Sequence, residues 1–104
     1  ARNKPIIGIC HGAFLLTEVL GGTVIEIAGH MNTEHDIEYF GDIIQVNSYH
    51  NLAITQAHNR AIILCRDGLG NIESWIDDNI AAVVWHPERM VTPWLPDEIQ
   101  GLLK

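Results

Sequence analysis

The segment Pro5-Ile6-Ile7-Gly8-Ile9-Cys10 forms an almost continuous apolar run, and it limits the possible folds of this chain more than any other feature. A short run of this kind, with no polar residue at alternate positions, is typical of a strand buried on both faces, as in parallel sheets. A strand with two buried faces needs other elements packed above and below it. The run therefore predicts an α/β fold.

Helix and strand patterns follow one another along the rest of the chain. Residues 13–20 have helical length and composition, and Gly21-Gly22 ends this helix, as a left-handed cap does. Strands are predicted at 23–27, 35–40, 43–46, 61–65, 72–76 and 80–85, and the strands 61–65 and 72–76 form a hairpin. Residues 28–34 and 47–51 are predicted as loops, and a short helix follows Pro96. With no linker or repeat, residues 1–104 are expected to form one domain.

Composition and charge exclude several function classes. Because 47% of its 104 residues are hydrophobic, the chain can bury a core, which excludes a disordered tail. No apolar stretch reaches the about 18 residues that a membrane helix needs, and we expect no secretory signal. A net charge of −7 argues against nucleic acid or an anionic membrane as the partner. The two cysteines are too few for a disulfide framework, which predicts a cytoplasmic location.

The pentapeptide Gly8-Ile9-Cys10-His11-Gly12 lies between the predicted strand and the predicted helix, which is the context of a nucleophile elbow. A sharp turn would strain the backbone at Cys10 and present its thiol at the start of the helix, whose positive end favours thiolate. The backbone N–H of His11 would then be placed to stabilise an oxyanion. The alternative is a buried structural cysteine beside two packing glycines.

The segment Trp85-His86-Pro87-Glu88 follows another buried strand. Histidine exchanges protons near neutral pH, so His86 is a candidate general acid/base for the thiol. Glu88, two positions later, can lie on the same side of an extended segment and orient the imidazole. Taken alone, a histidine at a strand end is more often structural, and it is the combination with the elbow that favours catalysis.

The ordered combination of these segments resembles the class I glutamine amidotransferase family, and within it the γ-glutamyl hydrolase branch (peptidase C26-like). Further similar segments are Leu20-Gly21-Gly22-Thr23, Asn47-Ser48-Tyr49-His50, and Asp67-Gly68 with Ile72-Glu73. The resemblance implies a flavodoxin-like three-layer sandwich. Because the family's domain is about twice as long, and because the chain offers the strand before Cys10 few parallel neighbours, we expect this chain to be its C-terminal part.

The resemblance also implies a role for each matched residue. Cys10 would attack a γ-glutamyl carbonyl and form a thioester, His86 would act as general acid/base, Glu88 would orient His86, and the His11 N–H would contribute to the oxyanion hole. Such chemistry needs no metal and no organic cofactor. His30 and His35 have a spacing that could suggest a metal, but no third ligand accompanies them.

The implied substrate contacts come from the elbow helix and from the Asn-Ser-Tyr-His segment, namely Gly12, Phe14, Ser48, Tyr49 and His50. Many family members have glutamine at the position of Phe14, where it helps to hold a glutamine substrate. The apolar replacement favours a different small-molecule γ-glutamyl substrate over free glutamine.

Other functions and partners stay open at this point. The partner would be a synthase subunit or the missing N-terminal half. The alternative function is a non-catalytic amidotransferase-like subunit or binding module, and a cysteine peptidase is a weaker one. Outside the motifs, His58 is predicted at the surface, Cys65 in the core, and Trp94 at the contact between the C-terminal tail and the domain.

Overall fold

The structure is a computed structural model that describes residues 4–27, 31–49 and 51–104, with the backbone alone for residues 31–33 and 49. Its elements, in chain order, are β1 (Ile6–Ile9), α1 (His11–Val19), β2 (Thr23–Glu26), β3 (Met31–Tyr39), β4 (Asp42–Tyr49), β5 (Leu52–Gln56), β6 (Ile62–Asp67), β7 (Ile72–Asp77), β8 (Ile80–Val83), the 3-10 helix η1 (Pro87–Arg89) and α2 (Asp97–Leu102). Within the described residues, neither α-helix has the length and apolar character needed to cross a membrane.

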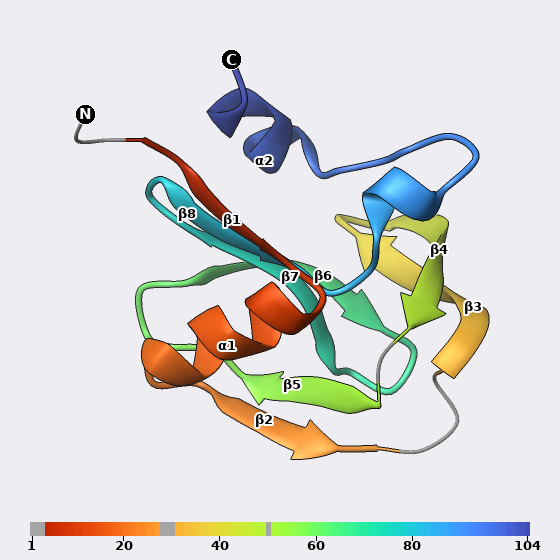
Figure 1. Cartoon of the computed structure of the whole chain (residues 1–104), viewed down its shortest axis with the longest axis horizontal. Coiled ribbons are helices and arrows are strands. Elements are labelled where there is room, and N and C mark those ends of the chain that lie inside the picture. Colours follow the sequence, from red (N-terminus) through yellow and green to blue (C-terminus); the bar gives the residue numbers. More distant parts are fainter. Residues whose placement is uncertain (1–3, 28–30, 50) are drawn as a thin grey trace.

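The described strands form one curled sheet (Figure 1). Its main path runs β1-β8-β7-β6-β3-β4, and β5 joins the sheet through β7 and carries β2 on its other side. β1 and β8 are parallel, whereas the remaining pairs are antiparallel. The predicted α/β class is confirmed, and the apolar run at the start of the chain forms the predicted parallel strand. The expected burial on both faces is wrong in this structure, because Ile6 and Ile9 are exposed.

Two hydrophobic cores lie on opposite sides of β7 and β8. One is covered by α1 and includes Phe14, Trp75 and Val84. The other lies under α2 and the β3–β4 hairpin and includes Ile37, Trp85 and Ile99. Because alternate residues of β8 point to opposite faces, Ala82 and Val84 belong to the first core and Ala81 and Val83 to the second.

A buried polar chain joins α1 to the sheet. The Thr17 hydroxyl donates to the Ala13 carbonyl at 2.7 Å within α1, and the Trp75 indole N–H of β7 donates to the Thr17 oxygen at 2.9 Å. Both side chains are fully buried, so each polar group finds a partner without water. The contact fixes α1, and with it the residue that precedes α1, against the centre of the sheet.

The β3–β4 hairpin turns through two residues in the left-handed region, Phe40 (φ 48°) and Gly41 (φ 91°). Such a pair favours the right-handed twist of antiparallel strands. The strands extend further than predicted: β3 begins at Met31 in a segment expected to be a loop, and β4 continues to Tyr49. These ends carry the polar residues Asn47 and Ser48 on β4 and Asn32, Thr33 and Glu34 on β3, a composition typical of loops, although Asn47 and Ser48 are buried. The strand β5 was not predicted at all.

The C-terminal tail packs on the sheet through Trp94, as predicted. The rings of Trp85 and Trp94 stack with centroids 5.7 Å apart, and the Trp85 indole N–H donates to the Trp94 carbonyl at 3.2 Å. The Tyr39 hydroxyl donates to the Glu98 carboxylate at 2.7 Å and so ties the hairpin to α2. The tail thereby covers the core on the face of the sheet opposite α1.

Glycine at position 8 is required by close packing between β1 and α1. A Cβ atom built on Gly8 would lie 2.6 Å from the Gly12 carbonyl oxygen and 2.8 Å from a methyl group of Leu16. A Cβ atom on Gly12 would meet nothing within 4 Å. The strand and the helix therefore approach one another at Gly8, and Gly12 is not a packing glycine.

We expect Gly8→Ala to lower the free energy of unfolding by about 1–3 kcal/mol, because the backbone of α1 must move away from β1. Gly12→Ala is the matched control, and it should be neutral or stabilising by up to about 1 kcal/mol, since alanine favours a helix. Urea unfolding of the two variants measures both values. Equal stability of the two variants would show that β1 and α1 do not pack as closely as described.

Candidate active site

Cys10 occupies the turn between β1 and α1 in a strained backbone conformation. Its φ of 53° and ψ of −106° are unfavourable for a residue with a side chain. Its N–H donates to the Val83 carbonyl at 2.8 Å, and its own carbonyl accepts from the N–H groups of Ala13 and Phe14 at 3.0 and 3.2 Å. The sharp turn predicted at the elbow is therefore present, and hydrogen bonds to β8 and α1 hold it in place.

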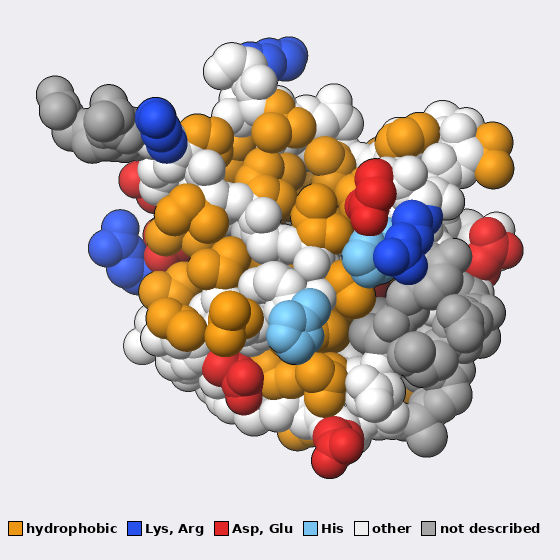
Figure 2. All heavy atoms as spheres, viewed as in Figure 1, with side chains coloured by type: hydrophobic (Ala, Val, Ile, Leu, Met, Phe, Trp, Pro, Cys, Tyr) orange, Lys and Arg blue, Asp and Glu red, His pale blue; other side chains and the backbone are white. Residues whose placement is uncertain are grey.

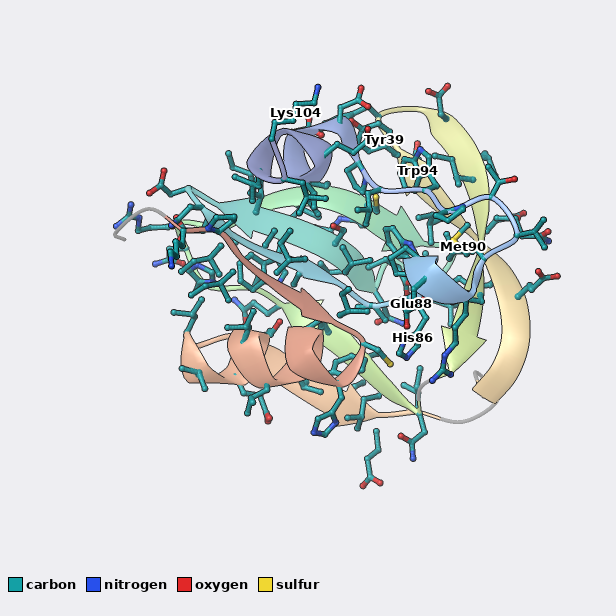
Figure 3. All side chains as sticks on the ribbon, turned by 45° about the horizontal axis from the view of Figure 1, so that its top comes forward. Tyr39, His86, Glu88, Met90, Trp94 and Lys104 are labelled. Carbon is teal, nitrogen blue, oxygen red and sulfur yellow. The ribbon has the colours of Figure 1, made fainter. Side chains whose placement is uncertain are left out.

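His86 reaches the same end of the sheet from the neighbouring strand. β1 and β8 run parallel with Ile9 opposite Val83, so Cys10 and His86 both follow the carboxyl ends of adjacent strands. His86 is the N-cap of η1 and is mostly buried, with 18% of its side chain exposed. Its Nδ1 lies 2.6 Å from a carboxylate oxygen of Glu88, which is 56% exposed. Figure 3 shows both side chains beside the end of α1 that follows β1.

Burial has the largest effect on the pKa of the Cys10 thiol. The side chain is 8% exposed, and desolvation raises its pKa above the ordinary value. A hydrogen bond from the His11 backbone N–H and the charge of Arg89 oppose this shift, whereas the charges of Glu88 and Glu73 add to it. The donor at the helix start lowers the pKa of Cys10, as expected, but the loss of solvation outweighs it and the net shift is upward.

Glu88 stays ionised over a wider pH range than an ordinary glutamate. Burial alone would raise its pKa, but hydrogen bonds from its own backbone N–H and from His86, together with the charges of His86 and Arg89, lower it below the ordinary value. An ionised carboxylate accepts a hydrogen bond from Nδ1 of His86 and fixes that proton there. This is the arrangement predicted for an orienting residue.

The His11 backbone N–H lies within hydrogen-bonding reach of the Cys10 sulfur, and the His11 side chain is exposed. A donor at this place is compatible with the predicted oxyanion role, which stays a prediction.

Of the residues predicted to bind substrate, Gly12 is partly exposed to solvent and others are buried. Gly12 lies in the first turn of α1, half-exposed. Phe14 and Ser48 are buried, Phe14 in the core beneath α1 and Ser48 near the end of β4. The side chain of Tyr49 and the whole of His50 lie outside the described residues. Substrate contacts by these residues stay predictions.

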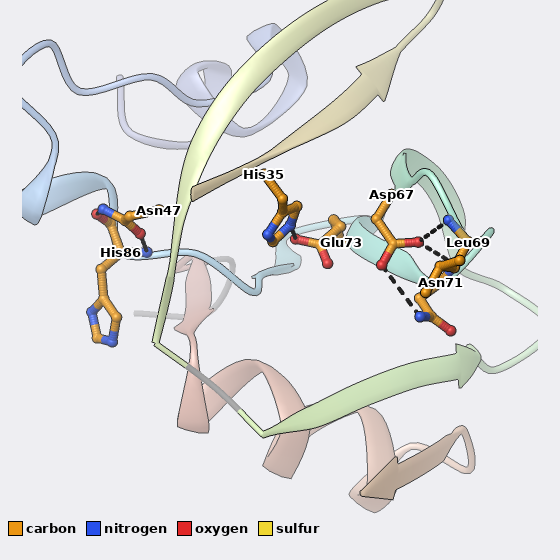
Figure 4. Close-up of polar contacts among 7 residues, drawn as sticks. All are labelled: His35, Asn47, Asp67, Leu69, Asn71, Glu73 and His86. Atoms are coloured by element: carbon orange, nitrogen blue, oxygen red, sulfur yellow. Dashed lines mark hydrogen bonds and ion pairs between the residues drawn. The ribbon is translucent and has the colours of Figure 1, made fainter. Parts of the chain in front are cut away.

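Two polar contacts beside the site were missed by the sequence analysis (Figure 4). The side-chain amide of Asn47 bonds both the N–H and the carbonyl of His86, each at 2.8 Å. His35 of β3 lies 3.1 Å from the carboxylate of Glu73 on β7, which is only 2% exposed. Both Asn47 and Glu73 belong to motifs noted in the sequence. Their partners are distant in the chain, so no local sequence pattern predicts these two contacts.

A third histidine also differs from its prediction. His58 was expected at the surface, yet 11% of its side chain is exposed, and its Nε2 lies 2.8 Å from an Asp77 carboxylate oxygen. Its ring packs edge-on against Trp75, with centroids 5.0 Å apart. In the part of the chain that the structure describes, no three His, Cys, Asp or Glu side chains are grouped to hold a metal ion. Of the pair His30 and His35, His30 lies outside that part.

Comparison with known proteins gives one family. The model of the family described as "Glutamine amidotransferase class-I" matches residues 1–101. A Mycobacterium tuberculosis protein named as a glutamine amidotransferase is 30% identical, over 85% of this chain and 36% of that protein.

Solved structures share the fold at lower identity. A glutamine amidotransferase from Thermotoga maritima has a TM-score of 0.74 at 21% identity, over 84% of this chain and 42% of its own. A Thermoplasma acidophilum protein named as part of a GMP synthase has a TM-score of 0.75 at 20% identity, over 84% of this chain and 49% of its own. The chain thus spans less than half the length of these relatives.

We expect iodoacetamide to label Cys10 faster than Cys65 in the folded chain. Cys65 is 1% exposed and burial raises its pKa to about 12, whereas Cys10 lies at the end of the sheet with a backbone donor and Arg89 nearby. The Cys10 rate should still rise with pH beyond neutrality, because the pKa of this thiol is also raised. Mass spectrometry of the cysteine peptides measures both rates. Labelling in denaturant, where the two rates should converge, is the control, and equal rates in the folded chain would contradict the assignment.

Stability should depend on pH through the buried pair of His35 and Glu73. The hydrogen bond to Glu73 raises the pKa of His35, although burial opposes it. A raised folded-state pKa means that the pair's contribution is complete below the unfolded value of about 6.5 and is lost as pH rises through the folded value. Urea unfolding on both sides of this interval should show lower stability at the higher pH. His35→Gln should reduce this difference, and His11→Gln, at an exposed position, should leave it. A His35→Gln variant with the wild-type pH dependence would exclude the pair as its source.

Proposed function

The chain belongs to the class I glutamine amidotransferase family, and on this premise we propose that it catalyses cysteine-dependent hydrolysis of a γ-glutamyl amide bond through a thioester on Cys10. The observation that carries the proposal is the strained Cys10 and the His86–Glu88 pair at the carboxyl ends of two adjacent parallel strands. In α/β sheets, ligands bind at this end of the strands.

The proposed reaction uses one proton carrier in both halves. With Nδ1 of His86 bonded to Glu88, Nε2 takes the Cys10 proton as the sulfur attacks the γ-carbonyl carbon. The His11 N–H stabilises the oxyanion of the tetrahedral intermediate. The C–N bond then breaks, and His86 returns the proton to the leaving amine, which gives a glutamyl thioester.

The second half restores the enzyme. His86 takes a proton from a water molecule whose oxygen attacks the thioester carbonyl, and the C–S bond breaks. The products are the free thiol of Cys10, which regains its proton from His86, and a γ-carboxylic acid, which ionises by releasing its proton to water. No group outside the chain, the substrate and water enters this balance.

The substrate is proposed to be a small γ-glutamyl compound other than free glutamine. An apolar, buried Phe14 stands on α1 where many relatives carry a glutamine, so a polar contact to the substrate is replaced by core packing. This feature favours the γ-glutamyl hydrolase branch of the family.

The alternative is a non-catalytic amidotransferase-like subunit. The raised pKa of Cys10 favours it, because a protonated thiol is a weak nucleophile, and so does the short span of the chain relative to its relatives.

We also propose a protein partner at the edge formed by β1, either the N-terminal half of the domain or a separate synthase chain. Among the described residues β1 is paired on one side, with β8. Ile6 and Ile9 of β1 and Leu15 and Val19 of α1 are exposed, and Figure 2 shows hydrophobic side chains gathered over these two elements. A parallel strand with an apolar, open edge is favourably covered by another element.

We expect Cys10→Ala to abolish glutamate release from γ-glutamyl substrates, because the variant has no thiol at the elbow to form the thioester. The far-ultraviolet circular dichroism of the variant should match the wild type, since alanine fits the turn. Glutamate release from a panel of γ-glutamyl amides measures the activity, and intact-mass spectrometry after acid quench detects the glutamyl adduct on Cys10.

Cys65→Ala is the matched control, and it should retain both activity and adduct. A wild-type chain that folds but forms no adduct with any member of the panel would favour the non-catalytic alternative. Adduct formation that persists in Cys10→Ala would assign the nucleophile elsewhere.

A further inference from the structure

A side-chain amide takes the place of a neighbouring strand beside His86. The Asn47 Oδ1 accepts from the His86 N–H, and the Asn47 Nδ2 donates to the His86 carbonyl, both at 2.8 Å. These are the two hydrogen bonds that one residue exchanges with its opposite residue in an antiparallel pair. Figure 4 shows Asn47 on β4 beside His86. Asn47 is 8% exposed, so these bonds are shielded from water.

The backbone at His86 needs such a partner because β8 has already ended at Val83. The next peptide, between His86 and Pro87, has no N–H, so its carbonyl is the one group through which hydrogen bonds can hold it. That oxygen accepts from Asn47 Nδ2 and from the Arg89 N–H at 3.1 Å. The amide therefore fixes both peptide groups that flank the Cα atom of His86.

The hairpin that carries Asn47 is itself tied to the strand next to β8. His35 on β3 lies 3.1 Å from the carboxylate of Glu73, and the Glu73 carbonyl accepts from the Val84 N–H at 2.9 Å. The hairpin thus contacts this edge of the sheet at two places: His35 contacts Glu73 near the start of β7, and Asn47 contacts His86 beyond the end of β8. The contact of His35 with Glu73 holds the hairpin in place, and Asn47 on that hairpin in turn holds the backbone of His86.

We propose that Asn47 is a positioning residue, whose amide sets the backbone of His86 and thereby the direction of its imidazole toward Cys10 and Glu88. The kinetic consequence rests on the proposed function. The orientation of the imidazole is a property of the fold that can be measured without turnover.

Two variants of Asn47 separate the two hydrogen bonds. Asn47→Ala removes both. Asn47→Asp keeps an acceptor for the His86 N–H but places a second carboxylate oxygen against the His86 carbonyl, where it cannot donate. The matched control is Asn79→Ala, which removes a similar bond, from Asn79 Nδ2 to the Lys4 carbonyl at 2.9 Å, at the opposite end of β1 and β8.

The first readout is the ¹⁵N spectrum of the His86 imidazole as a function of pH, and the second is kcat and KM with γ-glutamyl amides. In both Asn47 variants we expect the ¹⁵N and Nδ1–H resonances of the imidazole to move, because the contact with Glu88 is disturbed. We expect kcat to fall by about 10- to 100-fold with KM changed less than about threefold, since a displaced base affects the reacting state more than binding. Asn79→Ala should leave both readouts at wild-type values.

Unchanged imidazole spectra in folded Asn47→Ala and Asn47→Asp would overturn the proposal, as would a change of equal size in Asn79→Ala. If both Asn47 variants fail to fold while Asn79→Ala folds, Asn47 is a structural residue and the positioning role is rejected. If the wild type lacks activity, the proposed function fails, and the spectra alone decide the role of Asn47.

Discussion

The parallel pairing of β1 with β8 is the contact on which the rest of the molecule depends. It joins residues near the start of the chain to residues near its end, with Ile6 opposite Ile80 and Ile9 opposite Val83. Most of the chain lies between the two strands and folds into antiparallel pairs that extend from β7. Because the pair is parallel, the turn after β1 and the turn after β8 lie at the same edge. Cys10 and His86, which are distant in sequence, therefore both lie at this edge of the sheet.

That pairing also supports the strain at Cys10. A non-glycine residue with positive φ costs on the order of 1–3 kcal/mol, and it persists only where its surroundings over-determine it. Here the N–H of Cys10 continues the ladder to Val83, and its carbonyl begins α1. α1 is in turn held by the buried bond between Trp75 and Thr17 and by close packing at Gly8. The site is thus strained locally and supported by both the sheet and the helix.

Sequence reasoning recovered what local patterns encode. The apolar run predicted β1, the glycines after Leu20 ended α1, and the turn at residues 66–71 joined β6 to β7. The turn at Cys10 and the contact of His86 with Glu88 were predicted from short motifs, because each of them forms between residues close together in sequence.

Most contacts that depend on long-range packing were not predicted, the packing of Trp94 being an exception. The end of β4 has the polar composition of a loop, yet tertiary packing buries Asn47 and Ser48 there. His58 was assigned to the surface because its neighbours are polar, although it is covered by the strands around Asp77 and Trp75. The Asn47 amide finds His86 only after the hairpin has folded onto the end of β8. The net rise in the pKa of Cys10 was not predicted for the same reason, since the burial that outweighs the helix-start donor is set by tertiary structure.

The raised pKa of Cys10 changes which part of the site matters most. A thiol that carried its own negative charge at neutral pH could react with little help from a base. A buried thiol that stays protonated must lose its proton during attack, so the rate depends on how well the base is placed. Glu88 fixes one nitrogen of the imidazole, and the Asn47 amide fixes the backbone from which the imidazole projects. In the proposed reaction, the orientation of His86 therefore matters more than the acidity of Cys10.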